Sequence, residues 1–164
     1  MLIVGNRRFV QANFDSEEEL ENVVVEYSED IFGPSSLFIP KRLIRTGDGY
    51  GTIPDGIVID LSLRRWFIVE VELASHSIWS HIAPQVAKQL AAVSQRTSKQ
   101  VIIDLAVQLA KHDRSILEKF FDEDVAELDV RHFLDQILES QPIVAIPIDN
   151  IPADLRDWAS MLRY

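Results

Sequence analysis

Two apolar segments joined by a short polar loop constrain the fold of this chain more than any other feature. Residues 53–59 and 66–73 are rich in isoleucine, valine and aromatic residues, which is the composition of β-strands. Strand side chains point alternately to the two faces of a sheet, and one face of the second segment carries only apolar residues, namely Phe67, Val69, Val71 and Leu73. We therefore predict a hairpin whose second strand lies in the centre of a sheet.

Acidic side chains gather at the open end of this predicted hairpin. Glu70 and Glu72 lie on the same face of the second strand, and a turn centred on residues 62–63 places Asp55 opposite Glu70. The same register pairs apolar residues with one another, Ile57 with Ile68 and Ile59 with Trp66. Carboxylates on directly paired residues, whose Cβ atoms lie roughly 5 Å apart, repel each other unless a cation lies between them or one is protonated. A hard divalent ion, Mg²⁺ or Mn²⁺, is therefore the predicted cofactor.

Helical and strand patterns on either side of the hairpin predict an α/β domain. Ser16 and Glu19 form a capping-box pattern at the start of a helix that Gly33 ends. Its apolar face is predicted to comprise Leu20, Val23, Val24, Tyr27 and Ile31. The other predicted elements are a strand over residues 37–45, a turn over 46–51, a helix over 77–96 with Trp79 on its inner face, two or three helices within 99–140, a strand over 143–148 that Pro147 places at an edge or ends, and a helix over 152–163.

Length and composition fit one intracellular domain. A chain of 164 residues is long enough to bury a core of its own, and we predict a single domain over residues 1–164. The absence of cysteine excludes disulfides, zinc ribbons and thiol catalysis. No apolar run reaches the length of about 18 residues that a membrane span needs, so we expect no membrane span. The absence of cysteine fits a reducing compartment, so we expect a cytoplasmic location.

The charge of the chain weighs against binding to nucleic acid. The formal net charge is −10 at pH 7, whereas proteins that bind phosphates are usually basic on at least one face. The positive residues nevertheless cluster, at residues 7–8, 41–45, 64–65 and 88–99. This asymmetry leaves room for one basic face.

The sequence around the hairpin is similar to that of a known group of nucleases. Residues 54–55 (Pro-Asp), followed in a later strand by residues 70–72 (Glu-Val-Glu), resemble the PD-(D/E)xK motif of the restriction-endonuclease-like superfamily. The preceding helix carries Glu17 and the following helix carries Gln85, which fits the order of that superfamily's core. The wider pattern resembles a little-characterised branch of the superfamily, with Glu72 in place of the motif lysine.

The resemblance covers about residues 14–95 and implies a particular fold and activity. The implied fold is a restriction-endonuclease-like αβββαβ core, with a central mixed sheet flanked by helices and a helical insert at about 97–140. The implied activity is that of a metal-dependent nuclease, which hydrolyses DNA phosphodiester bonds through a carboxylate-bound Mg²⁺ or Mn²⁺ ion.

The resemblance also implies roles for individual residues. Asp55 and Glu70 would bind the ion together with the carbonyl of Val71, and Glu17 would reach it directly or through a water. The ion would activate the water that attacks the phosphorus. Glu72 would orient that water or hold a second ion.

Polar residues on the helix after the hairpin are candidates for functional roles beside the acids. His81, Gln85 and Gln89 recur at four-residue steps along one border of its apolar stripe, and that border would face the site. Gln85 would help to position the water or a phosphate. His81, Gln89 and Lys88 are candidates for substrate binding.

Simpler roles are open for several of these residues. Asp55 could be a turn residue after proline, Glu17 could serve only the helix dipole, and Gln85 could be an ordinary surface residue. His76 is expected at the surface or at a helix cap. Because His76 and His81 are five residues apart, they make a poor helical metal pair, and we predict no zinc site.

Two other interpretations of function are open. A catalytically inactive descendant of the nuclease fold could bind nucleic acid or protein, and the missing lysine and the acidic charge favour this reading. A structural helical protein with an incidental hairpin is disfavoured, because an idle acid cluster on a central strand would lower stability. The Leu and Phe positions of residues 97–140 are a candidate homodimer face.

Overall fold

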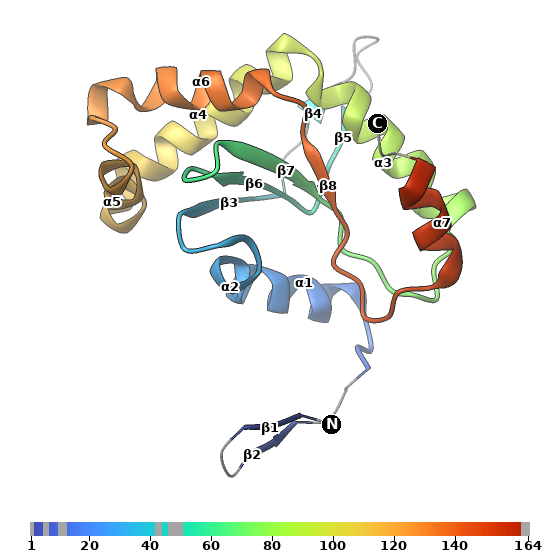
Figure 1. The fold of residues 1–164 in the computed structure, drawn as a ribbon. Helices are drawn as coiled ribbons and strands as arrows, with labels where there is room; N and C mark the ends of the chain where they lie inside the picture. The colour runs from blue at the N-terminus through green and yellow to red at the C-terminus, as the bar shows by residue number, and fades with distance from the viewer. Residues whose placement is uncertain (1, 5–6, 10–12, 42–43, 46–50, 162–164) are drawn as a thin grey trace.

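A four-stranded sheet lies at the centre of the fold, between two layers of helices (Figure 1). The computed structural model describes residues 2–4, 7–9, 13–41, 44–45 and 51–161. The strand order is β3–β6–β7–β8: β3 (Ser36–Pro40), β6 (Gly56–Asp60) and β7 (Arg65–Val69) are antiparallel neighbours, and β8 (Ile143–Ala145) runs parallel to β7. This mixed sheet flanked by helices confirms the predicted α/β class.

Helices cover both faces of the sheet and its β8 edge. One face packs against α1 (Glu17–Glu26) and α2 (Ser28–Phe32), and the other against α4 (Arg96–His112), α5 (Arg114–Asp122) and α6 (Val130–Glu139) (Figure 1). A π-helical turn, η1 (Ile78–Ile82), leads into α3 (Ala83–Val93), and both pack with α7 (Ala153–Met161) near β8. The remaining elements are a 3₁₀ turn, η2 (Glu127–Asp129), and two small hairpins, β1 (Leu2–Val4) with β2 (Arg7–Phe9) and β4 (Ile44–Arg45) with β5 (Gly51–Thr52).

The predicted register of the central hairpin is confirmed. Ile57 pairs with Ile68 and Ile59 pairs with Trp66, and these four side chains are fully or almost fully buried. The side chains of β7 are buried on both faces of the sheet, one set against α1 and α2 and the other against α3, α4 and α6. β7 is therefore a central strand, as the apolar pattern predicted.

Two predicted elements are less continuous than the sequence pattern predicts. The strand predicted over residues 37–45 stops at Pro40, which has no amide hydrogen to extend the ladder, and residues 44–45 pair instead with residues 51–52. The predicted turn at 46–51 falls mostly on residues outside the described part of the chain. The helix predicted over 77–96 is divided into η1 and α3, and the backbone is extended at Gln95 before α4 begins.

Three residues predicted on apolar faces are exposed. Trp79 is 55% exposed, because the wider turn of the π helix buries Ile78 and Ile82 on the inner side. Tyr27 and Ile31 are each 49% exposed, because the chain leaves the helical path at Tyr27, between α1 and α2.

The region predicted as a helical insert is part of the main core. Phe120, Phe133 and Leu134 are buried against the sheet face that carries Trp66 and Ile68. Most of the Leu and Phe positions that we assigned to a candidate dimer face are therefore packed inside the monomer. Of these positions, Phe121 and Leu128 are exposed.

The β1–β2 hairpin and β8 differ in their position relative to the sheet. The β1–β2 hairpin lies away from the sheet in Figure 1, whereas β8 forms one edge of the sheet, as the position of Pro147 predicted.

None of the helices in the described part of the chain combines the length and the apolar character that crossing a membrane requires.

Candidate metal centre

The extended segment that follows β7 forms the centre of the candidate site. The amide of Glu70 donates to the carbonyl of Ala145, and the amide of Glu72 donates to that of Pro147, each at 3.0 Å. These bonds keep residues 70–72 extended, so the side chains of Glu70 and Glu72 point to the same face. Each residue is only 1% exposed. Two carboxylates are thus fixed in the interior, where an unpaired charge is costly.

Glu70 is held by two glutamines of α3. The side-chain amides of Gln85 and Gln89 donate hydrogen bonds to its two carboxylate oxygens. The pKa of Glu70 is raised to about 8, first by burial and then by the negative charges of Asp55 and Glu72, although the hydrogen bond from Gln89 opposes this rise. Without a cation beside it, Glu70 therefore keeps its proton at neutral pH.

Asp55 ties the start of β6 to the end of β7. One carboxylate oxygen accepts a hydrogen bond from the amide of Val71 at 2.8 Å, and the other lies 3.2 Å from the ammonium group of Lys41. Lys41 also lies 2.7 Å from Glu21 of α1, and this hydrogen bond is the largest cause of its raised pKa. Asp55, Lys41 and Glu21 line a hollow of about 270 Å³ between α1 and the end of β3.

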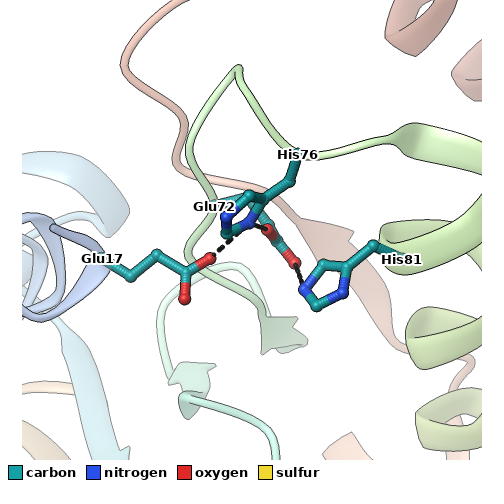
Figure 2. A group of neighbouring side chains, drawn as sticks. All are labelled: Glu17, Glu72, His76 and His81. Carbon is teal, nitrogen blue, oxygen red and sulfur yellow. Dashed lines mark hydrogen bonds and ion pairs between the residues drawn. The ribbon is translucent and has the colours of Figure 1, made fainter.

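Two histidines and two glutamates form a compact group (Figure 2). One ligand atom from each of Glu17, Glu72, His76 and His81 lies within 4.8 Å of the others. His76 Nδ1 is 2.8 Å from both Glu17 Oε1 and Glu72 Oε2, and His81 Nε2 is 3.6 Å from Glu72 Oε1. We call these four residues the His–Glu group.

Burial and close partners shift the pKa values within the His–Glu group. Burial is the main cause of the raised pKa of Glu72, and the hydrogen bond with His76 opposes it. The pKa of His76 is also raised, mainly by its hydrogen bond with Glu72. Both shifts favour the protonated forms of Glu72 and His76.

The His–Glu group corrects our interpretation of the histidines. We expected His76 at the surface or at a cap, and we rejected a paired histidine site because residues 76 and 81 are badly spaced for a helix. His76 precedes the helix, however, in a turn closed by a hydrogen bond from its amide to the carbonyl of Leu73 at 2.9 Å. The turn brings the ring of His76 back to that of His81, with ring centroids 4.9 Å apart.

The other predicted site residues divide between two neighbouring parts of the site. Glu70 lies near both Asp55 and Glu72 and so links the two parts. The His–Glu group is the only group of three or more convergent histidine and acidic ligands among the described residues. Glu17 belongs to that group through His76. Gln89, predicted as a substrate contact, is fully buried against Glu70 and so acts as a support for that carboxylate. Lys88 is exposed on α3.

Lys41 and His76 were missed as site residues for different reasons. Lys41 precedes Asp55 by 14 positions, and only the pairing of Pro40 with Gly56 brings the two side chains together. A strand pairing between β3 and β6, had it been predicted in register, would have indicated Lys41. His76 depends on a tight turn that no sequence pattern marked.

Comparison with protein-family models, with curated proteins and with solved structures finds no match to this chain. The likeness to the PD-(D/E)xK superfamily therefore depends on the residues described above.

Proposed function

We propose that this chain is a divalent-metal-dependent phosphodiesterase that hydrolyses DNA and has a restriction-endonuclease-like core. The observation that carries this function is the gathering of Asp55, Glu70 and Glu72 where the central strands end. The carboxylate of Glu70 is buried, is bonded to two neutral amides and lies near two other acids. A bound cation would take the place of the proton that burial and the neighbouring negative charges keep on Glu70. The element order α1–β3–β6–β7–α3–β8 also supports the αβββαβ core.

The oxygen donors at this corner suit a hard divalent ion. Asp55 and Glu70 would hold Mg²⁺ or Mn²⁺ with the carbonyl of Val71, and Glu17 would contribute through a water. The bound ion would supply Lewis-acid activation of water and of the phosphate. Glu72 would orient the attacking water or hold a second ion.

The residues around the acids orient the carboxylates for metal binding. The amides of Gln85 and Gln89 orient the carboxylate of Glu70, and the backbone amide of Val71 orients that of Asp55. Lys41 lies 3.2 Å from Asp55, so its ammonium group is placed to contact a phosphate oxygen of a substrate in the adjoining hollow.

The distribution of positive charge favours a local contact with DNA over a broad basic face. Arg65 pairs with Asp60 at 3.0 Å, and the guanidinium group of Arg64 lies over the ring of Phe133. Both arginines lie at the turn of the hairpin, at the end of β6 and β7 opposite to Asp55. Of the clustered basic residues that the structure describes, Lys41, directly after β3, and Lys88, on α3, lie nearer to the acids.

The test of this function is cleavage of plasmid DNA in the presence of Mn²⁺. Purified protein is expected to nick the plasmid, and Asp55→Ala and Glu70→Ala are each expected to lower the nicking rate by on the order of 100-fold or more, because each removes a proposed metal ligand. Glu139→Ala, which removes an exposed acid at the end of α6, is the control and should leave the rate unchanged. Equal cutting by all four proteins would refute these roles.

A non-catalytic binding module is the second candidate. Asp55 and Glu70 both have protein partners already, and such satisfied acids can persist without a cation. Isothermal titration calorimetry with Mn²⁺ separates the two candidates. Absence of heat at millimolar metal would favour the binding module.

Removing Lys41 is expected to strengthen cation binding at Asp55. The change Lys41→Ala deletes a positive charge 3.2 Å from the proposed ligand, and a half-exposed ion pair is worth about 1 kcal/mol or less, so Mn²⁺ affinity should rise by roughly two- to fivefold. Calorimetry measures the change, with Lys88→Ala as the matched control. Weaker Mn²⁺ binding by Lys41→Ala than by wild type would contradict this expectation.

A further inference from the structure

The His–Glu group draws its four ligands from separate pieces of backbone (Figure 2). Glu17 is the first residue of α1, Glu72 lies in the segment that extends β7, His76 lies in the turn that follows, and His81 lies in η1. Helix, strand extension, turn and π helix thus converge on one point. The group is therefore not a row of neighbouring acids on one exposed helix face.

Two backbone features fix the histidines at this point. Ala74 donates its amide to the carboxylate of Asp149 at 2.7 Å, which anchors the turn that carries His76. In η1 the amide of Ile82 bonds to the carbonyl of Ser77, five residues before it, at 3.3 Å. Such π turns are rare and occur frequently at functional sites, because they redirect a side chain that a regular helix would send elsewhere. Here the redirected side chain is that of His81.

A single ring nitrogen of His76 faces acceptor oxygens of two different carboxylates. His76 Nδ1 is 2.8 Å from carboxylate oxygens of both Glu17 and Glu72, and a ring nitrogen carries at most one hydrogen. His81 Nε2 also turns toward Glu72, whose carboxylate is 1% exposed. A single cation between the four side chains would satisfy all of them at once.

We infer that Glu17, Glu72, His76 and His81 form a binding site for a transition-metal ion, distinct from the hard-ion site proposed at Asp55 and Glu70. Imidazole nitrogen suits Fe²⁺, Co²⁺ and Zn²⁺, whereas Mg²⁺ and Mn²⁺ suit oxygen donors, and Mg²⁺ keeps several of its waters. A tetrahedral ion with bonds of about 2.0–2.1 Å needs donors roughly 3.3 Å apart. The donors lie within 4.8 Å of one another, so small side-chain rotations complete the site.

The exposure of the ligands gives this site one open side. Glu72 is buried at the back, while the side chain of His81 is 50% exposed and that of His76 is 34% exposed. Solvent or a small ligand can reach an ion held there. The site does not depend on the chain being a nuclease, and it would serve equally as a second metal of the proposed phosphodiesterase or as a separate centre.

Cobalt absorption tests this inference without any measurement of activity. Metal-stripped protein titrated with Co²⁺ is expected to develop saturable visible absorption bands, which Zn²⁺ abolishes and an equal concentration of Mg²⁺ leaves in place. His76→Ala and His81→Ala should each weaken Co²⁺ binding at least tenfold. His132→Ala, which removes an exposed histidine of α6, should bind as wild type does.

Further variants keep the outcome separate from that of the proposed nuclease. Asp55→Ala, which is expected to abolish nicking, should retain the cobalt bands. His81→Ala removes a half-exposed side chain, and an unchanged melting temperature without metal shows that it folds. Cobalt bands that persist in the His76→Ala/His81→Ala double variant, or that Mg²⁺ displaces, would overturn the transition-metal site whatever the plasmid assay shows. A wild-type protein that develops no bands would overturn it as well.

Discussion

Replacing Glu70 with glutamine is expected to stabilise the metal-free protein at pH 7 by on the order of 3 kcal/mol, although it removes a proposed metal ligand. The pKa of Glu70 rises from 4.5 to about 8 on folding, chiefly through burial. One pKa unit corresponds to about 1.4 kcal/mol, so a carboxylate that must stay protonated, or ionise in the interior, lowers stability at neutral pH by this order. Glutamine is neutral at every pH and escapes the penalty.

The same change is expected to flatten the dependence of stability on pH. Between pH 4.5 and about 8 the folded state binds the proton of Glu70 more tightly than the unfolded state does, so the contribution of Glu70 to stability is fully present below pH 4.5 and is lost as the pH rises to about 8. The raised pKa values of Glu72 and His76 act in the same direction and persist in the variant. The slope of stability against pH should therefore be smaller in the variant than in wild type, but it should not fall to zero.

Glutamine also has suitable partners at this position. The side-chain oxygen of Gln89 is buried and has no hydrogen-bond partner among the described residues, and it can accept a bond from the new amide at position 70. Urea unfolding in EDTA across this pH range measures the effect, with the exposed-site variant Glu139→Gln as the control. A Glu70→Gln protein with the slope of wild type would show that residue 70 is not the titrating group. Addition of Mn²⁺ should stabilise wild type more than the variant.

The hairpin and its acids could be predicted from sequence because their signals are local. Alternation along residues 66–73 identified a strand buried on both faces, and matching apolar pairs selected the register that brings Asp55 toward Glu70. The four-residue spacing of Gln85 and Gln89 likewise indicated the border of α3 that contacts Glu70. The periodic pattern of the sequence was sufficient to predict the position of a side chain wherever that side chain lies on a regular strand or helix.

The remaining parts of the site depend on irregular or long-range structure. His76 reaches His81 through a turn and a π helix, and neither of these follows a regular period. The same π turn moved Trp79 from the predicted inner face to the surface. Lys41 reaches Asp55 only after β3 has paired with β6. Sequence patterns that assume a constant period per element could not predict these contacts.

Gly56→Ala is expected to destabilise the protein by about 1–3 kcal/mol, because the site is too crowded for a methyl group. A Cβ at position 56 would lie 2.4 Å from Cζ of Phe38 and 3.0 Å from its two Cε atoms. The half-buried ring of Phe38 packs against the cluster between α1 and the sheet and lines the hollow beside α1, so displacing the ring costs part of its packing in that cluster. Gly56 follows Asp55 directly, so a displaced β6 should also weaken Mn²⁺ binding.

A double-mutant cycle identifies the crowding as the cause. Phe38→Leu shortens the side chain that the new methyl group would meet, and alone it should destabilise the protein by leaving space in the cluster. Combined with Gly56→Ala, it should be less destabilising than the sum of the two single changes, because the methyl group fills that space. Urea unfolding of the four proteins gives the coupling free energy. Strict additivity would mean that Gly56→Ala acts through the backbone of β6 and not through the ring of Phe38.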